Sequence, residues 1–343
     1  MERNIKIDFI KGVAITLVLI GHAIQGASDI EGTDCFENLF FKTIYSFHMP
    51  LFMVISGYLF YYSHQKAKSI QSILKKKALA FLPPILTLSF VLTIISLIFS
   101  KTQTYNDIFH DFIENIFLWR FWFLWSIIIN VTAIGIAFRF FNHPLRVIIL
   151  TMPLTMLIPD NMILPEHKFV YPFFVLGYII NMKRHSLILS SSKTRLLVFI
   201  ALYISMLYNY DKSCYIYTSG FCILKTNWLQ QIGIDIYRFI IGLLGVYLSI
   251  QLLYKIYSKI VMKIFANIGK ITLGVYVLQM FAMKFLTSIP KLSQSFSIMF
   301  AICFIYLAIF SIFGTYLSNK NSYLRMLILG KTIEFKKKSN KIR

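Results

Sequence analysis

Charged residues are scarce in this chain of 343 residues. They make up 14% of the sequence, whereas about 25% is usual in soluble domains. Acidic residues are especially few, with 14 against 35 lysines and arginines, so the formal net charge is +21. Apolar residues make up 57%, and they recur in blocks near the ~20 residues that cross a ~30 Å hydrocarbon core. The composition excludes soluble, disordered and collagen-like chains and predicts an integral membrane protein. Because its basic residues lie between the apolar blocks, as topology signals do, nucleic-acid binding is not expected.

Cysteine is also rare, and the pattern of metal ligands is missing. The sequence has four cysteines and contains neither an HExxH motif nor a paired Cys-x-x-Cys motif, so no metal site is predicted. Cys303 falls in the last apolar block, while Cys35, Cys214 and Cys222 fall in predicted outer loops. A Cys214–Cys222 disulfide and free thiols are both compatible with that placement.

Ten apolar blocks predict an all-α, polytopic bundle of about ten transmembrane helices. They cover residues 7–25, 43–62, 79–99, 119–140, 145–158, 169–182, 196–210, 232–254, 271–286 and 294–316. The fifth and sixth blocks are short, so they predict either a re-entrant pair or two tilted helices. No extramembrane stretch is long enough for a core of its own. Residues 1–343 are therefore expected to form one integral-membrane domain that ends in a basic tail over 317–343.

The distribution of charge predicts that both termini are cytoplasmic. With ten spans, most lysines and arginines fall on one side of the membrane, including Lys75, Lys76, Lys77 and those of the tail. Only Glu2, Asp8 and Glu334 of the 14 acidic residues fall on that side. Basic residues concentrate in cytoplasmic segments of membrane proteins.

The first block carries three polar side chains on one helical face. A charged residue at mid-span costs ~2.5–3.5 kcal/mol, so such residues usually line a functional cavity. At about 100° per residue, Asp8, Lys11 and His22 share a stripe, with Lys11 and His22 ~16 Å apart along the axis. The alternative interpretation is an interfacial Asp8–Lys11 pair with a structural His22.

A second histidine begins the next block. His48 lies about as far beyond the acidic loop (Asp29, Glu31, Asp34, Glu37) as His22 lies before it. On adjacent antiparallel helices the two imidazoles are expected to face one site, where one acts as base or acyl carrier and the other orients or stabilises charge. The alternative for His48 is helix packing beside Pro50, with the imidazole satisfying freed backbone groups.

These two segments resemble the acyltransferase family 3 membrane proteins. The resemblance rests on residues 7–22, 47–52 and 55–58, and it extends to 75–77 before Pro83-Pro84, 121–125, 174–178 and 269–276. The nearest branch is the nodulation-factor fucose O-acetyltransferase type. The family's signature of Arg, ten residues and His corresponds here to Lys11 and His22. Lysine keeps the charge but lacks the planar fork of arginine, and Gln279 stands where many relatives have histidine.

The resemblance implies a bacterial cytoplasmic-membrane enzyme that moves an acetyl or other acyl group from acetyl-CoA to a sugar hydroxyl of a surface polysaccharide or lipid-linked glycan. Acetyl-CoA is then a co-substrate, and no bound cofactor is expected. His22 and His48 are the predicted catalytic residues. Donor binding is predicted for Lys11, Asp8, Arg3, Lys75, Lys76 and Lys77. Gln25, Trp122 and Trp125 are expected on the acceptor side, with Gln25, Ser46 and Ser56 near the developing oxyanion.

Other interpretations remain open from the sequence alone. The lysine run also fits a loop that sets topology and binds lipid headgroups, and the aromatic segment 117–125 fits an interfacial belt. Asp235 and Arg238 fit a simple i,i+3 pair. An exporter of polysaccharide or lipid-linked sugar has the same architecture, although it should show inverted repeats and needs no acyl donor. The expected partners are acetyl-CoA, a glycan acceptor and membrane lipids, and the sequence does not define an oligomeric state.

Overall fold

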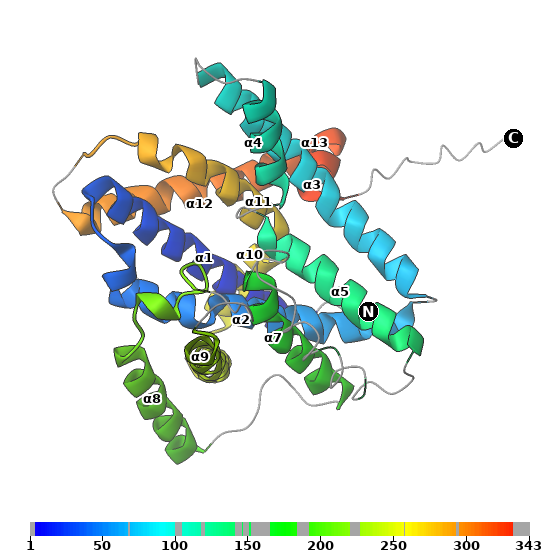
Figure 1. Cartoon of the computed structure of the whole chain (residues 1–343), viewed down its shortest axis with the longest axis vertical. Coiled ribbons are helices and arrows are strands. Elements are labelled where there is room, and N and C mark those ends of the chain that lie inside the picture. Colours follow the sequence, from blue (N-terminus) through cyan, green and yellow to red (C-terminus); the bar gives the residue numbers. More distant parts are fainter. Residues whose placement is uncertain are drawn as a thin grey trace, which may run out of the picture.

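The computed structural model describes residues 4–67, 69–99, 105–117, 121–140, 146, 151, 165–183, 192–219, 227–256, 258–292 and 295–331. In these parts of the chain every regular element is helical (Figure 1), as the sequence predicts. The α-helices are α1 (Ile5–Glu31), α2 (Leu39–Lys66), α3 (Ile70–Phe99), α4 (Tyr105–Phe117), α5 (Trp122–Phe140), α7 (Pro165–Met182), α8 (Lys193–Tyr208), α9 (Trp228–Ile256), α10 (Lys259–Lys270), α11 (Thr272–Ala282), α12 (Phe296–Lys320) and α13 (Ser322–Leu329). Short 3₁₀ turns occur at η1 (Cys35–Glu37), η2 (Lys212–Cys214) and η3 (Met283–Ser288).

Local capping determines where the first two helices begin and end. Asn4 Oδ1 accepts hydrogen bonds from the amides of Lys6 and Ile7 at the start of α1. Gly32, with φ +73°, ends α1 and donates its amide to the Ser28 carbonyl. Asn38 caps α2 in the same way as Asn4 caps α1. These are the usual asparagine N-cap and left-handed glycine C-cap, and they set the short turn between two long helices.

Two pairs of helices cross at glycines. A Cβ atom at Gly57 of α2 would lie 1.8 Å from the Phe174 carbonyl oxygen of α7, and one at Gly177 would lie 1.9 Å from the Val54 oxygen. The α1–α10 crossing is similar, because a Cβ at Gly12 would meet the Phe265 oxygen at 1.8 Å. Small residues allow helix backbones to approach this closely in membrane proteins. The crossings fix α1 and α2, which carry the predicted site, against α10 and α7.

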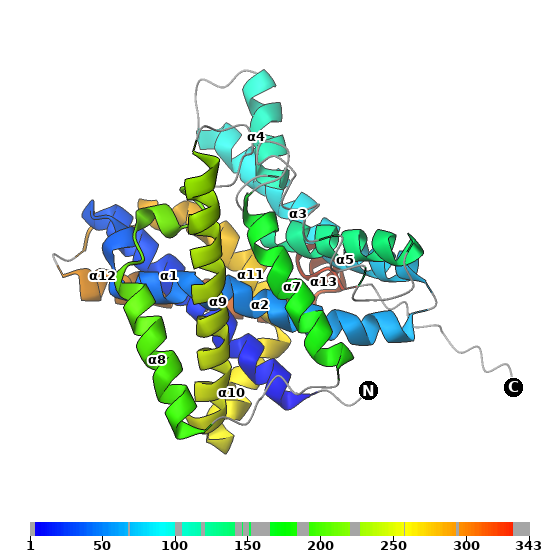
Figure 2. The same ribbon diagram turned by 60° about the horizontal axis from the view of Figure 1, so that its bottom comes forward.

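The remaining helices surround the α1–α2 pair. Figure 2 shows α7, α8 and α9 with roughly aligned axes, and α8 lies alongside α9 with the opposite chain direction. The helix α12 packs against α1 and α11, and α13 packs between α3 and α12. The predicted basic tail over 317–343 therefore begins inside α12 and continues as α13, and residues 332–343 lie outside the described part of the chain.

Within the residues that the structure describes, five helices are long and apolar enough to cross a membrane, namely α1, α2, α3, α9 and α12, and the number rises to seven if each of two bent pairs counts as one span, so the ten predicted spans stay a prediction. One pair joins α4 to α5, and the other joins α10 to α11 and η3 with a bend of 69°. The predicted ninth span, 271–286, is the second half of that bent pair. The predicted fifth span, 145–158, falls almost wholly outside the described residues, and the seventh corresponds to the 16-residue α8.

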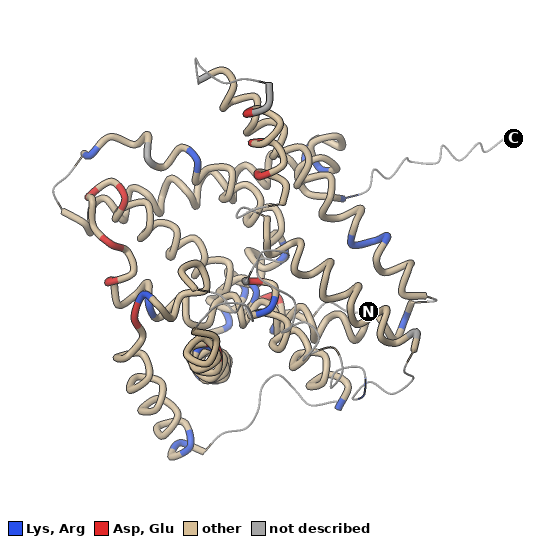
Figure 3. Tube along the Cα trace, in the orientation of Figure 1, with Lys and Arg blue, Asp and Glu red and all other residues tan. Residues whose placement is uncertain are grey.

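Acidic residues are concentrated at one end of α1 and α2. In Figure 3 they gather on the α1–α2 connection and on α4, while the lysines at the end of α2 and the start of α3 lie at the other end of α2. Lysines also lie among the acidic residues, where Lys42, Lys212 and Lys291 pair with Glu37, Asp34 and Glu31. The cytoplasmic placement of both termini stays a prediction.

Candidate functional site

One cavity lies near the C-terminal end of α1 and contains both predicted catalytic histidines. Its volume is about 420 Å³, and we call it the histidine cavity. It is lined by Val18, His22, Gln25, Phe36, Phe41, Tyr45, His48, Met49, Trp122, Tyr217, Tyr276, Met280, Met283 and Lys284. The space is large enough for a sugar ring, because small-molecule sites begin at around 300 Å³.

The hydrogen bond of His22 defines the state of its ring. His22 Nδ1 lies 3.2 Å from Gln25 Oε1, one helical turn further along α1. A carboxamide oxygen only accepts, so with Gln25 Oε1 as its partner Nδ1 of a neutral His22 ring carries the proton and Nε2 keeps its lone pair. The Tyr45 hydroxyl lies 3.5 Å from the same Nδ1. Gln25 therefore holds His22 in the tautomer that a base or nucleophile requires.

His48 is held in the same tautomer from the facing helix. Its Nδ1 lies 2.7 Å from the Ile44 carbonyl oxygen, and the residue is 4% exposed. Pro50 lacks an amide proton and therefore frees the carbonyl of residue 46, not that of Ile44. The imidazole therefore bonds a different carbonyl from the one that Pro50 leaves free, and the catalytic role of His48 stays a prediction. The Tyr45 ring lies between the histidines, 6.5 Å from His22 and 4.8 Å from His48 by ring centroids.

A second cavity, of about 260 Å³, lies toward the N-terminal end of α1 and contains Lys11, Lys77 and Lys270. We call it the lysine cavity. Lys11 Nζ lies 3.3 Å from Asp8 Oδ1, so Asp8 orients the lysine from outside the lining. Lys77 extends over the Phe81 ring, with its Nζ 5.4 Å from the ring centroid. Lys270 of α10 is exposed and donates to Asn267 Oδ1 at 2.9 Å. Three lysines from α1, α3 and α10 thus border one space, which suits a polyanionic group.

The two cavities adjoin. Val18, Met49 and Tyr276 line both of them. These residues come from α1, α2 and α11, so the polar stripe predicted on the first helix runs from one cavity into the other. A long, thin ligand with an anionic head in the lysine cavity would thus direct its far end toward His22.

The other predicted donor and oxyanion residues lie in different places. Lys77 lines the lysine cavity, but Lys75 and Lys76 are exposed on α3 and belong to neither lining. Arg3 falls outside the described residues. Ser56 lines the lysine cavity and not the histidine cavity. Ser46 is buried and hydrogen-bonded to the Tyr203 hydroxyl at 2.7 Å, so it does not face the histidines as expected.

The two tryptophans also differ. Trp122 lines the histidine cavity, in agreement with its predicted acceptor-side position. Trp125 instead donates its indole N–H to the Ile116 carbonyl at 2.8 Å and stacks on Phe117, which joins α5 to α4. Trp122 therefore faces the histidine cavity, whereas Trp125, three positions later on α5, faces α4. The sequence pattern alone did not distinguish them.

Several lining residues were not predicted as site residues from the sequence. Tyr217 and Lys284 reach the histidine cavity from the loop before α9 and from η3, and Tyr276 lines both cavities. Behind Trp122, Ser126 Oγ bonds the Trp122 carbonyl at 2.9 Å and lies 2.5 Å from His167 Nδ1 of α7. No spacing signal marks such residues, because long-range folding brings them together.

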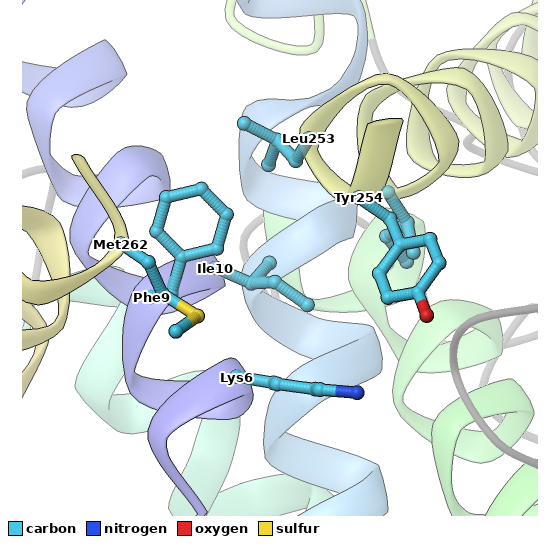
Figure 4. Close-up of a pocket in the computed structure, with 7 residues that line it drawn as sticks. Lys6, Phe9, Ile10, Leu253, Tyr254 and Met262 are labelled. Carbon is cyan, nitrogen blue, oxygen red and sulfur yellow. The ribbon is translucent and has the colours of Figure 1, made fainter. Parts of the chain in front are cut away.

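Other polar features lie away from these cavities. Gln279 is fully buried, and its side-chain atoms have no hydrogen-bond partner among the described residues. On α4, His110, Asp111 and Glu114 are close enough to share a metal ion. Figure 4 shows a small pocket in which Lys6 extends toward Tyr254, while Phe9 and Met262 lie on the other side of the pocket. Its volume of about 10 Å³ admits little more than one water molecule.

Cys222 lies outside the described part of the chain, so the Cys214–Cys222 disulfide remains a prediction. Cys35 and Cys303 are buried free thiols. Burial raises the pKa of the Cys35 thiol to about 11, so it is protonated near neutral pH. A thiol in that state is a poor nucleophile and metal ligand.

Comparison with known proteins identifies the family. The family model for the acyltransferase domain matches residues 4–328. A nodulation protein NolL of Mesorhizobium japonicum is 31% identical over 180 residues, which cover 52% of this chain and 48% of that protein. A nodulation protein NolL of Sinorhizobium fredii is 28% identical over 184 residues, or 52% of this chain and 49% of that protein. The matched region is thus about half the length of these curated relatives, and no solved structure matches. On the evidence of the domain match, the chain belongs to acyltransferase family 3, as its sequence motifs predicted.

Proposed function

We propose that this protein is a membrane-bound O-acyltransferase that moves an acetyl group from acetyl-CoA to a sugar hydroxyl of a surface polysaccharide or lipid-linked glycan. The observation that carries the proposal is the pair of adjoining cavities, one containing three lysines and the other two histidines. Acetyl-CoA carries phosphates at one end and a thioester at the end of a long arm. Its phosphates would match the lysines, and its thioester would match the histidines. Family membership and the similarity to two nodulation proteins support the same class of reaction.

The lysine cavity is the proposed site for the phosphates of coenzyme A. Lys11 and Lys77 are partly buried there, where opposite charges interact more strongly than in water. The pantetheine arm then passes Val18, Met49 and Tyr276, which line both cavities. The expected separation of Lys11 and His22, ~16 Å along α1, fits an extended arm rather than a compact ligand.

His22 is the proposed catalytic residue, and two balanced routes are available to it. As a general base, Nε2 takes the proton of the sugar hydroxyl while the hydroxyl oxygen attacks the thioester carbonyl. As a nucleophile, Nε2 attacks the thioester first and then passes the acetyl group to the hydroxyl. In both routes the carbon–sulfur bond breaks, coenzyme A leaves as its thiol after taking up a proton, and the sugar gains an ester.

His48 and Gln25 are proposed to assist His22. Gln25 orients the ring through its hydrogen bond at 3.2 Å, and its amide N–H group is a candidate donor to the developing oxyanion. His48 faces the same cavity with Nε2 unprotonated in the tautomer described above. It is placed to accept a proton from the acceptor or from a water molecule.

The proposed location is the bacterial cytoplasmic membrane, crossed about ten times with both termini in the cytoplasm. The lysine cavity then opens toward cytoplasmic acetyl-CoA, and the histidine cavity lies nearer the outer leaflet. The lysines at the end of α2 and the start of α3, at the far end of α2 from the acidic α1–α2 connection (Figure 3), support this orientation. The acceptor is accordingly proposed to enter from the outer side, with lipids surrounding the bundle.

The test is acetylation of the glycan in a strain that lacks the gene and is complemented with variants. We expect His22→Ala to reduce transfer at least about 100-fold, the usual contribution of a general base. His110→Ala is the matched control, because His110 is an exposed histidine of α4 that lines neither cavity. Mass spectrometry of the glycan measures the mass of one acetyl group per modified sugar. Full acetylation by a normally inserted His22→Ala protein would contradict the proposal, and unmodified glycan that fails to reach the surface would favour an exporter.

A further inference from the structure

Arg238 of α9 is a buried arginine whose contacts extend well beyond the i,i+3 pair expected from sequence. It is 1% exposed, and its Nη1 donates to Asp235 Oδ1 at 2.8 Å. The rest of the guanidinium faces one stretch of backbone. A buried charge is tolerated only when its donors are satisfied, so these contacts define the local structure.

The backbone in question is the segment from Asp211 to Ser219, which we call the cap loop. Arg238 Nε donates to the Cys214 carbonyl at 2.7 Å. Its Nη2 lies 3.0 Å from the Ser213 and Tyr215 carbonyl oxygens and 2.9 Å from that of Ser219, and it also contacts the Ser219 hydroxyl. One planar guanidinium thus gathers four carbonyls of a single loop. A lysine has no such fork of donors.

The cap loop is also tied to the connection between α1 and α2. Lys212 Nζ lies 2.8 Å from Asp34 Oδ2, and this hydrogen bond holds the pKa of Asp34 below its usual range. The Tyr215 ring packs on Phe36 at 4.4 Å and on Phe41 at 5.8 Å by centroids. The loop is therefore held between α9 and the turn that leads into the His48 helix.

Tyr217 is the residue of the cap loop that enters the site. It lines the histidine cavity, and its ring lies 6.1 Å from that of Tyr45, which in turn contacts both histidines. Burial raises the pKa of Tyr217, so its hydroxyl stays protonated and able to donate a hydrogen bond. Trp122 lies in the same lining, and no carboxylate is found among the described lining residues. Aromatic faces and a phenol donor suit an uncharged, hydroxyl-rich ring.

We propose that the cap loop forms part of the acceptor-binding wall, with Tyr217 in contact with the acceptor sugar and Arg238 as the positioning residue that holds the loop in shape. The inference deepens the proposed function, because it needs an acceptor in the histidine cavity. It adds a residue that selects the acceptor without touching the donor. Tyr217 lies outside the lining of the lysine cavity, so its replacement should leave acetyl-CoA binding intact.

The experiment measures steady-state transfer by the purified, detergent-solubilised full chain. The acceptor is the glycan purified from a strain that lacks the gene, and acetyl-CoA is varied separately. We expect Tyr217→Ala to raise the KM for the glycan about tenfold while the KM for acetyl-CoA stays within about twofold. Arg238→Lys should likewise raise the KM for the glycan and leave the KM for acetyl-CoA unchanged, because lysine keeps the charge but lacks the planar set of guanidinium donors. Asp235→Asn keeps an oxygen acceptor for Nη1 and should stay near wild type.

Tyr208→Ala is the matched control, since Tyr208 is a tyrosine of α8 that is 88% exposed. A parallel rise of both KM values, or a fall in kcat with both KM values unchanged, would overturn the inference. If Arg238→Lys does not insert, Tyr217→Ala alone decides between these outcomes. Wild-type protein that transfers no acetyl group would instead refute the proposed function, so the two failures are distinguishable.

Discussion

The three consecutive lysines of α3 illustrate how position decides the role of a residue. Lys77 is partly buried and lines the lysine cavity, whereas Lys76 is exposed one position earlier. If Lys77 binds a phosphate of acetyl-CoA, Lys77→Gln removes a hydrogen bond to a charged group that contributes about 1.5–3 kcal/mol. We expect its KM for acetyl-CoA to rise at least about tenfold, as measured by transfer to a fixed concentration of glycan.

Lys76→Gln provides the control, because it removes the same charge from the same helix. Its KM for acetyl-CoA should stay within about twofold of wild type, since a surface charge acts through screened interactions only. Equal effects of the two substitutions would show that the run acts through its overall charge, as in a loop that sets topology or binds headgroups. In that case direct donor contact by Lys77 would be ruled out.

At the scale of residues, the sequence predicted the site residues that share one helix, but it missed the residues whose role depends on long-range contacts. Asp8, Lys11 and His22 follow from helical periodicity, and Lys11 and His22 do line adjoining cavities. Arg238 looked like half of a local pair because its other contacts come from residues 19 to 25 positions earlier. Carbonyl acceptors leave no mark in a sequence, since every residue has one.

Among the helical elements, α2 and α7 depend on the close approach at Gly57. A methyl group there would lie 1.8 Å from the Phe174 carbonyl oxygen, so the two backbones must separate to admit it. Overpacking of this kind typically costs roughly 1–3 kcal/mol. We expect Gly57→Ala to lower the melting temperature of the detergent-solubilised protein and to shift His48, which lies nine residues earlier on the same helix.

Gly233 is the matched control, because it lies in α9 and a Cβ atom added there would meet nothing within 4 Å. Gly233→Ala should leave the melting temperature unchanged or raise it, as alanine favours a helix by up to ~1 kcal/mol over glycine. A Gly57→Ala protein as stable as Gly233→Ala would mean that the α2–α7 crossing relaxes without cost.

Apolar blocks predicted most of the long helices but not the amphipathic ones. The blocks at 7–25 and 43–62 lie within α1 and α2, while α4 and α10 were not predicted. Both of these helices are short and place polar residues on one face, so they do not register as continuous apolar stretches. The 69° bend after α10 likewise depends on packing against α1, which the order of residues does not reveal.

At the scale of the whole molecule, the two adjoining cavities would give the two proposed substrates separate routes to one site. The proposed donor, acetyl-CoA, is soluble and anionic, whereas the proposed acceptor is a glycan held at or beyond the membrane. Two cavities that adjoin at Val18, Met49 and Tyr276 allow each substrate its own approach. On the proposed function, the reacting groups would then meet at His22 and His48, where oriented hydrogen-bond donors would stabilise the charge that develops in the transition state.

This arrangement requires that the acidic turn after α1 and the lysine-rich turn after α2 lie on opposite sides of the membrane. Thr33 and Lys66 are exposed residues of those two turns. In a variant whose four cysteines are replaced by alanine, we expect Thr33→Cys to react with a membrane-impermeant maleimide in intact spheroplasts. Lys66→Cys should react only after the cells are lysed, because basic turns remain in the cytoplasm. The reverse pattern would place the histidine cavity nearer the cytoplasm, so a cytoplasmic glycan would have to be the acceptor, whereas labelling of both residues before lysis would contradict α2 as a complete span.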